Sequence, residues 1–290
     1  MSQYITEAFV QAFADNFMHV AQQSASRLEP CVSLEPGIVG ASKSINRLGQ
    51  RTAQRRLVRH GDTPINDQPH STRFIDLHDY EDGDMLDDQD KIRMLVDPTS
   101  DYVRAMVAAM NRAKDDELIA AMRGSARSAT STTVALPSGS KIAVGDSKGL
   151  TKAKLIEARQ KFRKNEADEE NGEELYLAYG NVQLSDLLTD TTLTNTEINT
   201  VLSLQAGSIK EATLMGFRMV PTERLVKSST TRYALAWAKS GVALGIGANV
   251  QTEIAKDPGK GFNVRIYAKM SLGAVRIEEE KVVEIACYEA

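Results

Sequence analysis

The chain has 290 residues, of which 42% are hydrophobic and 26% are charged, and its formal net charge is -4. This composition predicts one large or two ordinary folded domains, and it argues against wholesale disorder and against a general nucleic-acid binder. The only two cysteines, Cys31 and Cys287, lie near opposite ends, and we expect buried thiols rather than a disulfide. We expect no membrane-spanning helix and no secretory signal, because no long uncharged apolar run and no basic leader occur.

The N-terminal segment predicts an amphipathic helix. Thr6 is a suitable N-cap, and Phe9, Phe13 and Phe17 recur at every fourth residue and so share one face. Such a stripe packs either in the core of its own chain or on a second subunit.

Residues 37–72 contain few large apolar side chains and several glycines and prolines, which predicts two extended segments joined by a turn. Between Lys43 and His60 the stretch carries six cations and no acid. A segment so poor in apolar surface cannot be held by its own core, yet Ile45 and Leu48 are unusual in a disordered linker. We therefore expect a long hairpin that lies on a partner.

An acidic block follows, with eight carboxylates among residues 76–91. Aligned on Gly83 as a calcium-binding loop, it has Asp82 at one required position but Tyr80 and His78 at the other two, and Gln89 stands in place of the final glutamate. His78 has no second histidine or cysteine at zinc-ligand spacing. A solvated or contact-forming acidic face is therefore favoured over a metal site.

Residues 97–124 predict a long helix with Asp97 as its N-cap and Gly124 at its end. Apolar side chains between Val103 and Met122 recur at three- and four-residue spacing and form one stripe. The far face of the helix is expected to be charged, with Arg104, Arg112, Lys114, Asp115, Asp116 and Glu117.

The remainder of the chain predicts a mixed α/β arrangement. We expect a small hairpin around residues 137–140, a helix capped by Thr151, and then short helices and strands. The last part alternates strongly between apolar and polar residues, which is typical of strands, and the segment KDPGKG predicts a turn between two of them.

No motif for catalysis or cofactor binding is present. The four histidines lie in no triad context, and GVALGIGANV has Gly245 and Gly247 but lacks the third glycine of a dinucleotide-binding loop. We therefore expect no enzyme, no cofactor and no metal.

The basic stretch leaves two interpretations open. Its arginines contact the phosphates of nucleic acid, or they pair with the acidic block on a neighbouring copy of the chain. The stretch contains no aromatic residue for base stacking, and the opposing acids are present in the same chain, which favours charge pairing. The residues expected to make contacts between copies are Phe9, Phe13, Phe17, Arg47, Arg51, Arg55, Arg56, Arg59, Asp76, Asp79, Glu81, Asp82 and Asp84.

The order of these elements resembles the major capsid proteins of tailed bacteriophages, the Hong Kong ninety-seven fold family. The strongest parts of the likeness are Arg59-His60-x-Asp62-Thr63-Pro64, the passage from Asp87-x-x-Asp90 to Asp97-Pro98, and the final strands with SLGAVRIEEEKVVEI. The resemblance implies an α+β capsid fold. Its expected parts are an N-terminal arm at 1–36, an extended β-hairpin loop at 37–76, a peripheral domain at 77–174 with a spine helix at 97–124, an axial domain at 175–235, and peripheral C-terminal strands at 236–290.

The resemblance also implies a function, namely self-assembly into an icosahedral shell that encloses double-stranded DNA. The implied partners are further copies in pentamers and hexamers, DNA packaged without sequence specificity, separate scaffolding and portal proteins, and decoration proteins, with no membrane. The implied location is the virion, after assembly in the cytoplasm of a bacterial host. The alternatives are an encapsulin-like nanocompartment shell, a nucleic-acid-binding module that uses the arginines of residues 43–59, and, more distantly, a metal-dependent enzyme that uses the acidic block.

Overall fold

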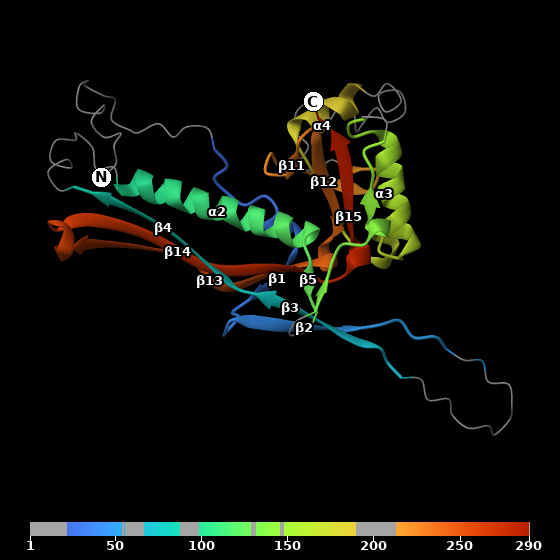
Figure 1. Cartoon of the computed structure of the whole chain (residues 1–290), viewed down its shortest axis with the longest axis horizontal. Coiled ribbons are helices and arrows are strands. Elements are labelled where there is room, and N and C mark those ends of the chain that lie inside the picture. The colour runs from blue at the N-terminus through green and yellow to red at the C-terminus, as the bar shows by residue number, and fades with distance from the viewer. Residues whose placement is uncertain are drawn as a thin grey trace.

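The fold is seen in a computed structural model, which describes residues 22–53, 55, 67–87, 99–128, 132–145, 148–189 and 213–289 of the chain. Within these ranges the chain forms a four-stranded sheet, a seven-stranded sheet and two small two-stranded sheets (Figure 1). The helices of the described part are α2 (Thr99–Arg123), α3 (Lys152–Lys164) and α4 (Asn181–Thr189).

The four-stranded sheet is built on two long antiparallel strands, β13 (Val242–Asp257) and β14 (Asn263–Arg276). The predicted turn joins them at Pro258–Lys260. β4 (His78–Leu86) pairs with β14 along one edge, and β1 (Ser33–Pro36) pairs in parallel with the inner end of β13 at the other.

Helix α2 lies along one face of this sheet (Figure 1). The predicted apolar stripe packs against the strands, and Met110, Leu118 and Met122 are fully buried there. The long helix is therefore confirmed, although the predicted cap at Asp97 lies outside the described residues.

The expected charged far face of α2 is only partly correct. Lys114 and Asp115 are buried, because the chain segment at residues 22–29 packs on this side of the helix. A pattern of charges on a helix cannot show that a distant segment covers them.

The seven-stranded sheet stands beside the first sheet, with α3 and α4 next to it (Figure 1). In its core, the rings of Phe162 and Phe217 meet edge to face at 5.9 Å. The strands, in spatial order, are β7 (Lys141–Ile142), β15 (Val282–Tyr288), β12 (Thr231–Ala238), β8 (Leu175–Tyr179), β10 (Phe217–Pro221) and β9 (Thr213–Leu214), with β11 (Lys227–Ser228) paired to β12.

The pairing of the strands changes one expectation and bears on another, the domain boundary, which stays a prediction. The small hairpin around residues 137–140 is wrong, because β6 (Thr133–Val134) pairs with β5 (Ala126–Arg127), whereas β7 pairs in parallel with β15. The two ends of that segment are thus held by different sheets. The boundary expected at 235/236 falls inside β12, and β15 lies in the seven-stranded sheet rather than beside β13 and β14.

The predicted long hairpin is confirmed at its base. β2 (Ser42–Leu48) and β3 (His70–Asp76) pair antiparallel over their whole length and project from the body of the molecule (Figure 1). The turn of the hairpin lies outside the described residues. Both cysteines are free and buried, as predicted, and burial raises the pKa of the Cys31 thiol to about 11.

Candidate functional site

The inner face of the β2–β3 hairpin alternates cations with isoleucines. Lys43, Ile45 and Arg47 of β2 are half-buried against the body, and Arg73 and Ile75 of β3 are 5% and 0% exposed. Because side chains alternate along a strand, these residues share one face. The hairpin therefore rests on the body through a mixed polar and apolar contact surface.

One carboxylate holds both strands of the hairpin. Glu279 lies in the short 3-10 helix η7 (Glu279–Lys281), which links β14 to β15, and its side chain is 8% exposed. Its Oε1 accepts from Arg73 Nη2 at 2.8 Å, and its Oε2 accepts from Arg47 Nη1 at 3.3 Å. Closer to the sheet, Lys43 Nζ donates to Glu35 of β1 at 2.7 Å.

Beneath the hairpin, the sheet has glycines where β3 crosses it. Gly245 and Gly273 are cross-strand partners on β13 and β14. A Cβ at Gly273 would overlap the main-chain carbonyl of Asp76, and a Cβ at Gly245 would lie 2.8 Å from Cγ2 of Ile75. Glycine is required at position 273, because the main chain of the hairpin touches the backbone of the sheet there, whereas at Gly245 the hairpin packs through the side chain of Ile75.

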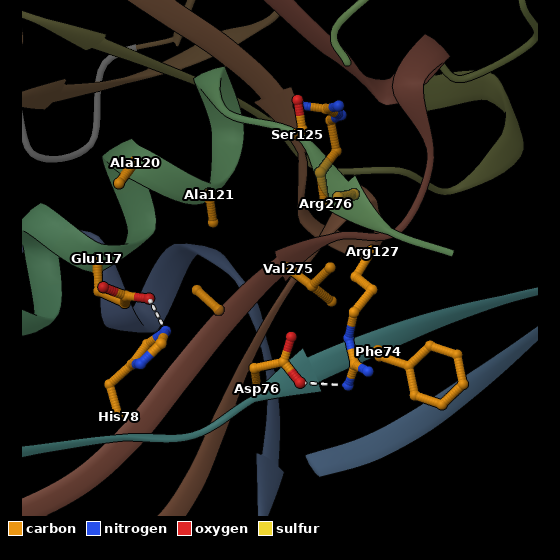
Figure 2. A pocket seen from close by; sticks show the side chains of 12 residues that line it. Phe74, Asp76, His78, Glu117, Ala120, Ala121, Ser125, Arg127, Val275 and Arg276 are labelled. Carbon is orange, nitrogen blue, oxygen red and sulfur yellow. Dashed lines mark hydrogen bonds and ion pairs between the residues drawn. The ribbon is translucent and has the colours of Figure 1, made fainter. Parts of the chain in front are cut away.

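A hollow of about 230 Å³ lies beside this crossing, lined by residues of α2, β3, β4, β5 and β14 (Figure 2). An ion pair between Asp76 and Arg127 lines it, and His78 Nε2 lies 3.9 Å from Glu117 Oε1. The guanidinium of Arg127 also lies over the ring of Phe74, 4.5 Å from its centroid. The described residues contain no group of three or more His, Cys, Asp or Glu side chains suited to a metal ion.

The acidic residues of β4 point to both faces of an edge strand. Glu81 lies opposite Lys269, and Asp82 lies opposite Ala268, whose side chain is buried toward α2. The hydroxyl of Tyr267 donates to Glu81 at 2.8 Å, and this hydrogen bond raises the pKa of Tyr267. Charge on both sides of a strand edge opposes unspecific pairing with other strands.

The predicted contact residues fall into three groups. Phe9, Phe13, Phe17, Arg56 and Arg59 lie outside the described residues. Arg51 and Arg55 are exposed beyond β2, and Asp79, Glu81, Asp82 and Asp84 lie on β4.

Arg47 and Asp76 form the third group, since each forms an ion pair within its own chain at the base of the hairpin. Arg47 binds Glu279, and Asp76 binds Arg127. Both residues thus hold the base of the hairpin, and contacts of any of the predicted residues with other copies stay a prediction.

The sequence did not reveal two carboxylates that fasten segments to the body: Glu279, which holds the hairpin, and Asp115, which holds the segment before β1. Glu279 is one of three consecutive acids between two strands, and nothing in that run distinguishes the buried one. Asp115 stands in the polar run of α2 and was expected on the charged face. Their only signal in the sequence is their place: Glu279 lies three residues before a buried strand, and Asp115 lies in the middle of a helix that covers a sheet.

Asp115 anchors the segment that precedes β1. Its side chain is 0% exposed and accepts hydrogen bonds from Ser26 Oγ at 2.5 Å, from the main-chain N–H of Arg27 at 3.1 Å and from that of Leu28 at 3.2 Å. The amide of Gln23 donates to it as well. A buried carboxylate that accepts several hydrogen bonds in this way fixes the path of the segment along α2.

Comparison with known proteins decides the family. A model of a family described as phage capsid protein matches residues 5–289. The chain belongs to the phage capsid protein family. No helix in the described part of this capsid protein is long and apolar enough to cross a membrane.

Solved structures agree in fold across nearly the whole capsid protein. The chain from Mycobacterium phage Che8 superposes with a TM-score of 0.71 at 14% identity, over 95% of this chain and 96% of that chain. The capsid of Ralstonia phage GP4 gives 0.72 at 12% identity, over 97% and 96%. The capsid asymmetric unit of cyanophage Pam1 gives 0.69 at 13% identity, over 100% of both chains. A search of curated protein sequences found no match.

These comparisons confirm the expected α+β capsid fold of tailed phages. They also favour a phage shell over a nanocompartment shell, because both the family and the structural neighbours are phage capsids. The protein is therefore a structural component of a virion.

Proposed function

We propose that this capsid protein is the major subunit of an icosahedral shell, built from pentamers and hexamers, that encloses double-stranded DNA. The observation that carries the proposal is the hairpin. It is fastened to the body at its base, but the part that projects beyond the body has no hydrophobic core of its own. Leu48, at the outer end of β2, is 70% exposed. Apolar surface on a projecting two-stranded hairpin is stabilised when it packs on another molecule, since an isolated hairpin is marginal in water.

The two sheets suggest a division of the subunit. We propose that the seven-stranded sheet with α3 and α4 is the axial domain around the symmetry axes, and that the four-stranded sheet with α2 is the peripheral domain. This division takes the whole of β12 and β15 into the axial domain, because strand pairing joins them to β8. Residues before β1 are the arm, and the hairpin is the extended loop.

Charge sets the register of the hairpin on its neighbour. The cations beyond β2, Arg55 and Arg56 among them, face the acidic edge strand β4 of an adjacent copy. Exposed ion pairs contribute only about 0.2–1 kcal/mol each, so they select the partner while apolar burial supplies most of the affinity. Repetition over a closed lattice makes such small terms sufficient.

If the shell encloses a genome, further partners and a place of assembly follow for the subunit. Its further partners are DNA held without sequence specificity, separate scaffolding and portal proteins, and decoration proteins. The subunit acts as a structural rather than a catalytic protein, and the shell assembles in the cytoplasm of the bacterial host.

Imaging the overexpressed full-length protein by negative stain, with sizing by light scattering, tests the proposal. Closed particles of uniform size are expected, with or without co-expressed scaffolding protein. A protein that stays monomeric under every assembly condition, and is retained as a monomer on DNA at physiological salt, would support the nucleic-acid-binding module instead.

Reversal of charge on the hairpin tests the register. The double variant Arg55→Glu with Arg56→Glu should fold normally but form few closed particles, because it places acids against the acidic edge of the neighbour. The matched control, Arg55→Lys with Arg56→Lys, keeps the charge and should assemble. Normal particles with unchanged salt sensitivity in the reversed variant would rule out charge pairing.

A further inference from the structure

The two sheets of the subunit are joined by connections that touch each other. The 3-10 helix η5 (Lys239–Gly241) leads from β12 to β13, and η7 leads from β14 back to β15. The main-chain N–H of Ile277 donates to the carbonyl of Gly241 at 2.8 Å. Lys281 Nζ donates to Ser240 Oγ at 2.8 Å and binds Glu173 at 2.9 Å. We call residues 239–241 and 277–281 the junction.

Glu279 belongs to this junction and to the base of the hairpin at the same time. Its main-chain carbonyl accepts from Ser140 Oγ at 3.1 Å, which fixes the backbone of η7. Its two carboxylate oxygens take one arginine each, from β2 and from β3. A rotation of the hairpin about its base therefore pulls on the backbone between the two sheets.

Glu279 lies among several arginines, which strengthens its link between the hairpin and the junction. Arg276, three residues before Glu279, is 0% exposed and donates to the carbonyls of Met122 and Gly124, each at 2.8 Å, at the end of α2. Burial lowers the pKa of Arg276, and the charge of Glu279 opposes that effect. Glu279 thus binds the two arginines of the hairpin, and its charge also acts on the arginine that ties down α2. Breaking a buried ion pair of this kind is costly.

We propose that Glu279 is a positioning residue that fixes the direction of the hairpin relative to the junction, so that hairpin and junction move together. The coupling is a property of the single subunit. Its consequence, that docking of the hairpin on a neighbour sets the angle between the two sheets, rests on the proposed function.

The same hairpin offers a matched comparison. Lys43 and Glu35 form another ion pair between hairpin and body, but it lies between β2 and β1, and both side chains are partly exposed. A pair that only fastens the hairpin should act locally, whereas the Glu279 contacts should act on the junction as well. The two carboxylates can therefore be compared by the same substitution to glutamine.

Hydrogen exchange of the full-length chain, kept unassembled at low concentration, separates these roles. In Glu279→Gln, amides of β2 and β3 should exchange about tenfold faster or more, because two arginines lose their counter-charge. Junction amides should accelerate with them, notably Lys239, bonded to the Glu174 carbonyl at 3.0 Å, and Ile277. In Glu35→Gln, the change should stay within about threefold and near Lys43.

Two results would overturn the coupling. One is faster exchange of the hairpin in Glu279→Gln with unchanged junction amides, and the other is the same response to both glutamine variants. If Glu279→Gln fails to fold, seen as rapid exchange throughout β8, Arg47→Gln removes only the longer contact and keeps Arg73 on Glu279. It should give the same joint pattern at smaller amplitude, and a response confined to β2 would overturn the proposal.

The experiment does not depend on shell formation. A chain that shows the joint response but never forms closed particles would keep the coupling and contradict the proposed function. Particles of normal appearance from a chain without the joint response would support the proposed function and contradict the coupling.

Discussion

The two sheets differ in how many of their residues are buried by other parts of the described chain. Every residue of β8 is buried, and so is every residue of β15 except the last. In β13, by contrast, only the first four residues are buried, and nearly all from Asn249 to Lys256 are exposed. The seven-stranded sheet thus completes its own core, whereas the outer half of β13 in the four-stranded sheet stays uncovered within the described residues.

The exposed half also carries large apolar side chains. Ile254 on β13 is 55% exposed, and Phe262 after the turn is 61% exposed. A shell subunit needs one half that keeps its shape in solution and another whose surface is buried on assembly. The difference between the sheets suggests that this capsid protein divides these tasks between them.

The largest effect is expected in the seven-stranded sheet. Phe217 is 0% exposed and packs edge to face on Phe162. Phe217→Ala should lower the free energy of unfolding of the unassembled chain by about 3–5 kcal/mol, through lost burial and the cavity left behind. Urea denaturation measures this, and a loss below about 1 kcal/mol would contradict a self-sufficient core in this sheet.

Acid should weaken the same sheet through Glu289. Burial alone would raise the pKa of this carboxyl, but hydrogen bonds from Arg232, Gln183 and Lys227 outweigh burial and lower the pKa to about 2. Because the folded-state pKa lies below the ordinary 4.5, the group stabilises the fold above pH 4.5, and this contribution is lost as the pH falls toward 2.

The contribution of Glu289 is on the order of 3 kcal/mol, since each pKa unit corresponds to about 1.4 kcal/mol. Denaturation curves of the native chain and of Glu289→Gln between pH 7 and pH 3 should converge as the pH falls. Parallel pH profiles of the two proteins would show that the carboxylate contributes nothing.

The anchor of the segment before β1 should show the next largest effect. Asp115→Ala leaves several buried donors without an acceptor and should cost about 2–3 kcal/mol. The neighbouring Asp116, which pairs with Arg224 on the surface, is a matched control, and Asp116→Ala should cost less than about 1 kcal/mol. Equal losses in thermal or urea unfolding would show that Asp115 is no special anchor.

The smallest effect on the folded subunit is expected at the exposed end of the four-stranded sheet. Phe262→Ala should change the free energy of unfolding of the unassembled chain by no more than about 0.5 kcal/mol, because the ring is largely in water. The same variant should give shells that dissociate at lower urea concentration. Shells of unchanged stability would show that this end of the sheet makes no contact between subunits.

Local patterns predicted much of this fold. The three- and four-residue spacing of apolar side chains located α2, the alternating segments located β13 and β14, and KDPGKG marked the turn between them. The antiparallel base of the hairpin also followed from composition. These features depend on neighbours in the sequence, so the sequence alone could show them.

Long-range contacts account for what the sequence did not show. Asp115 is buried by a segment almost ninety residues away, as its hydrogen bonds to residues 23–28 show. The expected hairpin around residues 137–140 does not form, because Arg276 of β14 binds the carbonyl of Val134 at 2.9 Å while Ile142 joins β15. Likewise, only the crossing of β3 over the sheet explains the need for Gly273.

Hydrogen exchange compared between closed shells and the dilute unassembled chain tests the central claim most directly. Assembly should protect the amides of β2 and β3 and of the outer half of β13, residues 249–257, and should leave β8 and β15 as slow as before. Equal protection of the hairpin and of outer β13 in both states would show that the single chain already completes its fold, which contradicts the account.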